Sequence, residues 1–183
     1  MITRHTTTHW NTLKRTQGHS DLDFFNELNE QGEEEARQIG RQLLEQGITR
    51  IVSSDLKRAK QTAEIINQSL GVKLFFDPGL RECCFGELEG MTRDESVEKF
   101  GSAVSEQWSN FFEYDFSPFH GETRDQVFDR HLDVLKKNYA ENGEKILLVG
   151  HGRGLWTLLA GLGYAPRLKV GDCRSIDFSL RAP

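Results

Sequence analysis

Two histidines far apart in the chain, His5 in Thr-Arg-His-Thr and His151 in Val-Gly-His-Gly, each follow a short strand-like run. The carboxyl ends of buried strands are where open α/β sheets bind their ligands. Arg4 directly precedes the first of these histidines. A neutral imidazole is a nucleophile, and a guanidinium binds anions through a fork of N–H donors. The two segments therefore predict a pocket in which an anion is bound and attacked.

A second arginine, Arg58, lies in the segment Ser-Ser-Asp-Leu-Lys-Arg-Ala-Lys-Gln-Thr-Ala at 53–63. The pattern predicts a turn from a strand into a helix, with Arg58 near the first helical turn. There it would lie beside backbone N–H donors and the positive end of the helix dipole, which together favour anions. The alternative is that Arg58 belongs to a solvated face, as we expect for Lys57 and Lys60. Spacing alone does not separate these two interpretations.

The elements that must position these residues alternate between strands and helices. Strands are predicted over 1–4, 50–53, 72–76, 145–149 and 174–180. Helices are predicted over about 30–46, 55–70, 92–100, 102–112, 123–135 and 152–162, with Asp55, Thr92 and Thr123 as N-caps and Gly47 as a stop. The stretches 5–28 and 78–90 are predicted loops. Such alternation implies a mainly parallel sheet covered on both faces, so we expect a three-layer α/β/α sandwich.

Length and composition fit one domain spanning 1–183. The net charge of -5 argues against nucleic acid or a membrane surface as the main partner. No apolar run approaches the roughly 18–20 residues that span a bilayer, and no signal peptide is predicted. The three cysteines include the neighbours Cys83 and Cys84 and show no zinc-like spacing, so a reduced, cytoplasmic setting is expected. The oligomeric state is left open.

Further segments carry polar residues in a set order. They are Trp10-Asn11, Arg15, Gln17-Gly18, Arg81-Glu82 with Phe85-Gly86 and Glu89-Gly90, Gly121-Glu122-Thr123, and Gly150-His151-Gly152. Together with Arg4-His5 and the 53–63 segment, they resemble the histidine phosphatase superfamily, which includes the phosphoglycerate mutases. The resemblance runs from residue 2 to about 180 and implies the phosphoglycerate mutase-like fold.

The resemblance also implies roles for these residues. His5 would be the nucleophile and would form a phosphohistidine that water hydrolyses, with its other ring nitrogen held by an acceptor such as a backbone carbonyl. Arg4, Arg58 and His151 would surround the phosphoryl oxygens, and the amide of Asn11 and the backbone N–H of Gly152 would add neutral donors. Because two arginines balance a dianionic phosphoryl group, no metal and no cofactor are predicted.

Glu82 would protonate the leaving alkoxide and then activate water. A solvated acidic face is the alternative, since Glu87 and Glu89 are close by. Glu82 is favoured because it occupies the proton donor's place in the pattern Arg-Glu-x-x-Phe-Gly-x-x-Glu-Gly. Glu89 is expected to brace the loop.

Two positions depart from the family's pattern. Thr6 stands where glycine usually follows the nucleophile, and a β-branched residue there is expected to narrow the pocket or to fix the loop differently. Members resembling α-ribazole phosphatases carry threonine there, so the change is not interpreted as inactivating. Arg153 stands where a small or apolar residue is common. It would reach the far end of the substrate or point to solvent, and solvent is favoured.

The segment between Glu82 and His151 is short beside that of a mutase, and Cys83 and Cys84 replace the basic residues of that branch. A lid or insertion is predicted at about 91–122. Its aromatic stretch 111–120 would pack in the core or line the pocket of an apolar or ring-containing substrate. His120 is a candidate substrate contact, whereas His9, His19 and His131 are expected to be surface or structural residues.

These features predict a phosphomonoesterase that hydrolyses a small phosphorylated metabolite, such as a sugar phosphate or a nucleotide-tail intermediate like α-ribazole phosphate. The alternatives are a phosphoglycerate mutase, a protein phosphatase acting on phosphohistidine, and a non-catalytic phosphate-binding protein.

Overall fold

The computed structural model describes residues 1–21, 24–110, 112–139 and 144–176. The described residues form a five-stranded sheet in the order β3-β2-β4-β1-β5. Its strands are β1 (Ile2–Arg4), β2 (Ile48–Ser53), β3 (Lys73–Phe76), β4 (Lys145–Gly150) and β5 (Cys173–Arg174). The first four strands run parallel to one another, and β5 pairs antiparallel with β1. The prediction of a mainly parallel α/β sheet is confirmed.

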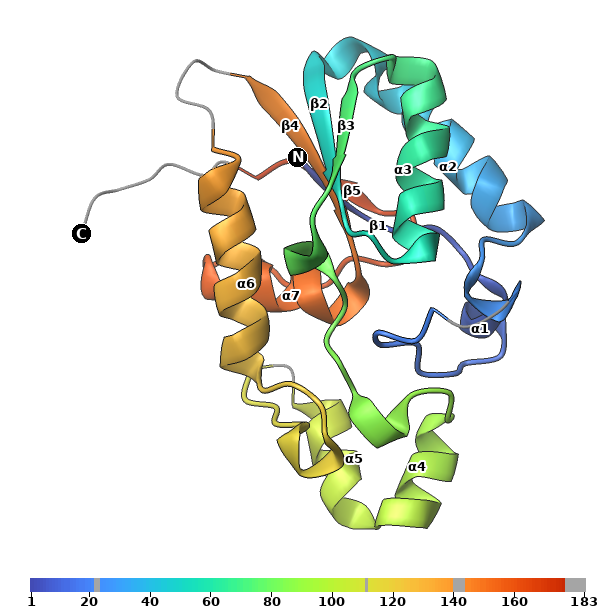
Figure 1. The fold of residues 1–183 in the computed structure, drawn as a ribbon, viewed down its shortest axis with the longest axis vertical. Coiled ribbons are helices and arrows are strands. Elements are labelled where there is room, and N and C mark those ends of the chain that lie inside the picture. Colours follow the sequence, from blue (N-terminus) through green and yellow to red (C-terminus); the bar gives the residue numbers. More distant parts are fainter. Residues whose placement is uncertain (22–23, 111, 140–143, 177–183) are drawn as a thin grey trace.

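Helices cover both faces of the sheet (Figure 1). On one face lie α2 (Glu30–Leu43) and α3 (Lys57–Leu70), and on the other α6 (Arg124–Lys137) and α7 (Gly152–Gly161). The central strand β4 shows why two layers form, because its successive side chains point to opposite faces. Leu147 and Val149 pack in the core shared with α2 and α3, and Leu148 packs in the core shared with α6 and α7. The three-layer sandwich is confirmed.

The predicted insertion at 91–122 packs around an apolar core that it shares with the preceding loop and with α6. It contains α4 (Arg93–Phe100), α5 (Ser102–Ser109) and the 3-10 helix η5 (Ser117–Phe119). Figure 1 shows α4 and α5 at one end of the molecule, away from the strands. Their core also takes residues from outside the insertion and comprises Cys83, Phe85, Leu88, Val104, Trp108, Tyr114, Phe116 and Val127. We call residues 91–122 the lid region below.

Short helices interrupt the stretches predicted as loops. The first of these stretches contains α1 (His9–Thr12) and η1 (Phe24–Asn26), and the second contains η3 (Pro78–Leu80) and η4 (Gly86–Leu88). A further 3-10 helix, η2 (Leu44–Gln46), extends α2 as far as Gly47, whose φ of 68° ends the helix as predicted.

Helix ends were predicted with mixed success. Thr92 and Thr123 form capping boxes at α4 and α6, as expected. Asp55 was wrong as the cap of α3: that helix begins after Leu56, with no side-chain cap of its own. Asp55 instead accepts two hydrogen bonds from Arg81, at 2.7 and 2.6 Å. The carboxylate of Asp21, from a distant loop, accepts the backbone N–H of Lys57 at 2.9 Å.

Two further boundaries differ from expectation. The helix predicted over 102–112 ends at Ser109, and the last strand is only Cys173–Arg174, with 177–180 outside the described residues.

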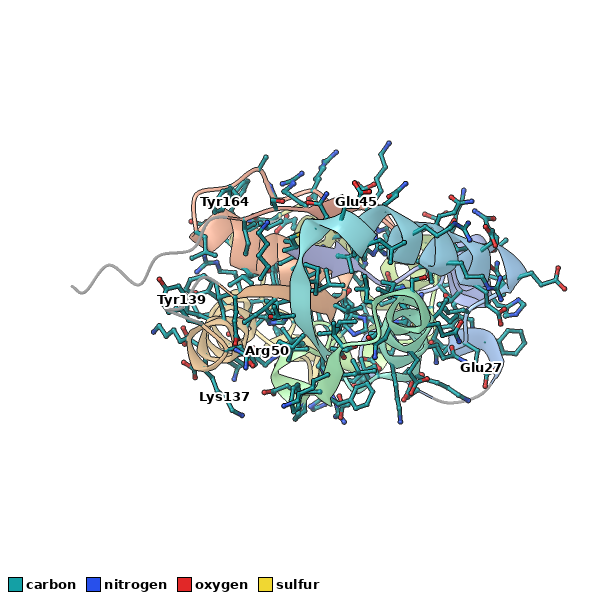
Figure 2. All side chains as sticks on the ribbon, turned by 90° about the horizontal axis from the view of Figure 1, so that it is seen from above. Glu27, Glu45, Arg50, Lys137, Tyr139 and Tyr164 are labelled. Atoms are coloured by element: carbon teal, nitrogen blue, oxygen red, sulfur yellow. The ribbon has the colours of Figure 1, made fainter. Side chains whose placement is uncertain are left out.

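Seen from above, Lys137 and Tyr139 at the end of α6 lie on the opposite side of the molecule from Glu27 (Figure 2). Over the described ranges, no helix has both the length and the apolar character needed to cross a bilayer.

Candidate active site

The predicted site residues meet where the parallel strands end. Strands β1 and β4 are in register at Arg4 and Gly150, and β2 and β4 at Ser53 and Val149. The backbone N–H of His5 then donates to the Gly150 carbonyl at 2.9 Å. These pairings bring the segments after β1, β2 and β4 to one edge of the sheet, as expected for a ligand site in an open α/β fold.

His5 is buried and held in one orientation. Its Nδ1 lies 2.8 Å from the Thr6 carbonyl oxygen. Because a carbonyl only accepts, Nδ1 carries the proton and Nε2 keeps its lone pair. Burial lowers the pKa of His5 well below its usual value, and the positive charges of Arg58 and Arg4 lower it further. The imidazole is therefore neutral, and the predicted carbonyl acceptor is confirmed.

Three buried nitrogen atoms near His5 have no hydrogen-bond partner among the described residues. Among the described residues, seven buried side-chain atoms lack a hydrogen-bond partner, and they include Arg4 Nε, Arg58 Nε and His151 Nδ1. The rings of His5 and His151 lie 5.2 Å apart. Arg58 is fixed by its Nη2, which donates to the Gly18 carbonyl at 2.8 Å, and burial lowers its pKa to about 10, so the guanidinium stays charged.

Asn11 and Gly152 lie on the wall of the same cavity. Asn11 Oδ1 accepts hydrogen bonds from the N–H and the hydroxyl of Thr8, both at 3.0 Å, which fixes the side-chain amide. Gly152 is the first residue of α7. A Cβ there would lie 3.1 Å from Arg4 Cζ, so the absence of a side chain lets the guanidinium lie against the start of the helix.

Glu82 is buried and bound to the start of α7. Its Oε1 accepts from the backbone N–H of Cys83 at 2.9 Å and of Gly154 at 2.8 Å. Its Oε2 accepts from the backbone N–H of Arg153 at 3.2 Å. Since each carboxylate oxygen offers two lone pairs, Oε1 is fully used, whereas Oε2 keeps one lone pair for a proton.

One cavity of about 620 Å³ joins these residues. Six of the seven predicted site residues line it: Arg4, His5, Asn11, Arg58, Glu82 and Gly152. The seventh, His151, is completely buried beside His5. The structure thus brings the whole predicted set together at what we call the inner end of the cavity.

The outer rim of the cavity was not predicted from the sequence. We give this name to the exposed lining residues Lys14 and Arg93. The buried Phe85 and Trp108 and the half-buried Trp156 also line the cavity. Trp156 lies one helical turn after Gly152, a spacing that places both on one face of α7 and could have revealed it. Its ring lies 5.7 Å from Arg4 Cζ. Lys14 has a φ of 55°, a conformation rare outside glycine, which no sequence pattern signals.

The prediction that Arg153 points to solvent was wrong. Its residue surface is only 4% exposed, and its guanidinium donates to the carbonyls of Asn110 and Trp108 at 3.2 and 3.3 Å. Its Cζ also lies 4.7 Å from the Tyr114 ring and 5.5 Å from the Phe116 ring. Aromatic faces and carbonyl oxygens stabilise the buried cation, so Arg153 connects α7 to the lid region.

Thr6 fixes the loop and does not line the cavity. Its N–H donates to Thr62 Oγ1 at 3.1 Å, and the two hydroxyl oxygens lie 3.2 Å apart. The Thr62 hydroxyl in turn donates to the Arg58 carbonyl at 2.7 Å. Of the two effects considered for Thr6, the structure supports the anchoring of the loop, here to α3.

Glu89 braces the neighbouring loops, as predicted. Its carboxylate accepts from the backbone N–H groups of His19, Ser20 and Phe85 at 2.8 to 3.0 Å. His120 was wrong as a substrate contact: its side chain is 82% exposed, lies 3.2 Å from Glu87 and does not line the cavity.

His131 and two residues of the aromatic stretch 111–120, Tyr114 and Phe116, are structural. His131 is fully buried, donates from Nδ1 to the Val127 carbonyl, and has its pKa lowered to about 3 by burial. Tyr114 and Phe116 pack inside the lid region, Phe112 is exposed, and residue 111 lies outside the described residues.

Comparison with known proteins agrees with this geometry. Residues 1–175 match the family model of the histidine phosphatase superfamily (branch 1). The chain is 35% identical over 181 residues to a probable phosphoglycerate mutase GpmB of Salmonella paratyphi A, covering 94% of this chain and 80% of that protein. It is also 35% identical over 155 residues to phosphoglycerate mutase-like protein 4 of Arabidopsis thaliana, covering 83% and 65% of the two chains.

Solved structures give the same result. Bacillus stearothermophilus YhfR superposes with a TM-score of 0.77 at 31% identity, over 88% of this chain and 78% of that one. A mycobacterial glucosyl-3-phosphoglycerate phosphatase superposes with a TM-score of 0.74 at 28% identity, over 88% and 79%.

The fold and the match together define an enzyme of the phosphoryl-transfer kind, of phosphatase or mutase type. The chain belongs to the histidine phosphatase superfamily, branch 1.

Proposed function

We propose that the protein is a phosphomonoesterase that transfers the phosphoryl group of a small metabolite to His5 and then to water. The observation that supports this most is a set of buried nitrogen atoms that have no hydrogen-bond partner among the described residues, Arg4 Nε, Arg58 Nε and His151 Nδ1, beside the neutral His5. Buried polar groups are normally hydrogen-bonded, so these atoms favour an anionic ligand with several acceptor oxygens. A phosphoryl dianion has that chemistry.

The reaction we propose has two steps. His5 Nε2 attacks phosphorus, the bond from phosphorus to the ester oxygen breaks, and the leaving alkoxide takes a proton from Glu82 Oε2. Water then attacks the phosphohistidine, giving its proton to Glu82 while the phosphorus–nitrogen bond breaks and phosphate leaves. Arg4, Arg58 and His151 would stabilise the charge on the phosphoryl oxygens in both steps.

A phosphoglycerate mutase is the second candidate, and the rim of the cavity favours it. Cys83 and Cys84 do not line the cavity, so the absence of charge at those positions does not set its electrostatics. Lys14 and Arg93 do line it and would attract a second anionic group on the substrate. Phosphate release from 3-phosphoglycerate or other phosphorylated metabolites supports the phosphatase, whereas isomerised phosphoglycerate without phosphate release supports the mutase.

The His5→Ala variant tests the covalent mechanism. We expect hydrolysis of p-nitrophenyl phosphate to fall by at least about 10⁴-fold, because the nucleophile is lost. The wild-type enzyme, quenched during turnover of a ³²P-labelled ester, should carry acid-labile, base-stable label on His5. His120→Ala is the control, since His120 is exposed and lies outside the cavity. Undiminished turnover by His5→Ala would exclude the proposal.

A further inference from the structure

Ser54, which directly follows β2, contacts the second histidine of the site. Its Oγ lies 2.8 Å from His151 Nε2, and both residues are completely buried. The backbone N–H of Ser54 donates to the Val149 carbonyl at 2.9 Å, so the serine is held by the sheet next to the strand that carries His151. The contact is therefore part of a rigid framework.

The hydrogen-bond partners of Ser54 indicate which atom donates. Ser54 Oγ already accepts the backbone N–H of Leu56 at 3.2 Å. A hydroxyl oxygen has two lone pairs, so this contact alone does not decide the direction. Among the described residues, however, His151 Nε2 is the only acceptor for the buried hydroxyl hydrogen, and buried polar groups are normally hydrogen-bonded, so the hydroxyl donates to Nε2. When Nε2 accepts, the single proton of a neutral imidazole is on Nδ1. Burial, and after it the positive charge of Arg58, lowers the pKa of His151 well below its usual value, so the ring is neutral.

We infer that Ser54 is a positioning residue that keeps the proton of His151 on Nδ1, where it donates to a phosphoryl oxygen of the bound ligand. Nδ1 of His151 is buried and has no hydrogen-bond partner among the described residues. In the opposite tautomer, a bare lone pair on Nδ1 would face an anion and repel it. The inference rests on the proposed phosphoryl site.

The two histidines would then share one tautomer and present opposite ends to the ligand. The Thr6 carbonyl holds the Nδ1 proton of His5, which leaves the Nε2 lone pair for attack. The Ser54 hydroxyl occupies Nε2 of His151, which leaves the Nδ1 proton for donation. One ring would act as the nucleophile and its neighbour as a hydrogen-bond donor, and each role is selected by a single oxygen atom.

Two-bond ¹H–¹⁵N spectra of the full chain, labelled with [¹⁵N]histidine and saturated with inorganic phosphate, test this directly. His151→Gln identifies the His151 signals. We expect the wild-type protein to show the proton on Nδ1. In Ser54→Ala we expect mixed tautomers, phosphate binding weakened about 10- to 100-fold, and a similar loss of kcat/KM for p-nitrophenyl phosphate.

Ser53→Ala is the matched control. Ser53 is also fully buried, and its hydroxyl donates to the Ser54 carbonyl at 2.9 Å without contacting His151. We expect it to change phosphate affinity less than about 3-fold, since it leaves every donor of the site in place.

Two results would overturn the inference: a wild-type phosphate complex with the His151 proton on Nε2, or a Ser54→Ala variant that matches Ser53→Ala in tautomer and affinity. Even if Ser54→Ala does not fold, the wild-type spectrum shows which ring nitrogen of His151 carries the proton and can overturn the inference. Neither the spectrum nor phosphate affinity requires turnover. An active His5→Ala variant would therefore remove the proposed mechanism and leave this inference to be decided separately.

Discussion

The inner end and the outer rim of the cavity are built in different ways. At the inner end, His5 follows a strand, Arg58 lies at the start of a helix and Glu82 comes from a loop, and backbone groups fix all three side chains. The Thr6 carbonyl holds His5, the Gly18 carbonyl holds Arg58, and N–H groups at the start of α7 hold Glu82. At the rim, Lys14 and Arg93 are exposed and come from a loop and from the lid region.

This difference indicates a division of labour. Preorganised, buried donors stabilise developing charge effectively because they need little rearrangement during the reaction. Such an end suits one invariant chemical group. Side chains on loops and at exposed helix ends vary and adapt more easily, and they suit the rest of the substrate. We therefore expect inner-end variants to change the chemical step and rim variants to change the choice of substrate.

The largest of the remaining effects should come from Glu82→Gln. We expect kcat/KM for alkyl phosphates to fall about 10²- to 10⁴-fold, because the leaving alkoxide loses its proton donor. For p-nitrophenyl phosphate the loss should be much smaller, since its leaving group departs without protonation. The measurement is kcat/KM against leaving-group pKa, which reports formation of the phosphohistidine.

Glu87→Gln is the control for Glu82→Gln, because Glu87 belongs to the same loop but does not line the cavity. Equal losses across all leaving groups in Glu82→Gln would contradict a proton-donor role. Such a result would leave Glu82 only the task of holding the start of α7.

We expect a middle-sized effect from Arg153→Met, a variant that tests whether the inner end and the outer rim of the cavity act independently. The variant leaves the carbonyls of Trp108 and Asn110 without their donor, a loss of about 1–3 kcal/mol in the free energy of unfolding. Arg153 itself lines the cavity, and without it the lid region loosens, so KM for metabolite substrates should rise about 10-fold, an effect of the size that a kilocalorie or two produces. Denaturant titration and steady-state kinetics measure these changes.

The inhibition constant of inorganic phosphate should stay within about 3-fold in Arg153→Met, since phosphate needs only the inner end. Arg153→Lys keeps the charge but not the fork of donors, so we expect it to restore only part of the stability. A parallel loss of phosphate binding and substrate binding in Arg153→Met would show that the two ends are not independent.

The same division explains what the sequence could and could not predict. His5 and His151 were identified because they follow strands, and parallel strands end at a shared edge whatever the rest of the fold. Spacing left Arg58 open between an anion site and a solvated face, and its role came from the resemblance to the family. Arg153 was misjudged because its burial depends on Tyr114 and Phe116, which are distant in the sequence.

Tertiary contacts also overrode local rules elsewhere. Asp55 has the residue type and position of an N-cap, but Arg81 attracts its carboxylate, and Asp21 from another loop takes over the N–H of Lys57. Local patterns therefore predicted the elements and the two histidines of the inner end, and the family resemblance supplied its other residues. They did not predict the rim, whose residues meet only in the folded chain.

The smallest effects should come from Lys14→Met and Arg93→Met, and they test the rim most directly. Each should raise KM about 3- to 5-fold for a phosphate ester with a second anionic group, because an exposed charge pair contributes about 1 kcal/mol or less. For p-nitrophenyl phosphate, which lacks that group, we expect less than about a 2-fold change on the same grounds. The difference in KM effect between the two substrate classes should shrink in high salt as screening increases.

Lys99→Met is the control, because Lys99 is an exposed cation on α4 that does not line the cavity. If both substrate classes responded equally, Lys14 and Arg93 would act on the phosphoryl group itself, and the rim would lose its separate role in substrate choice.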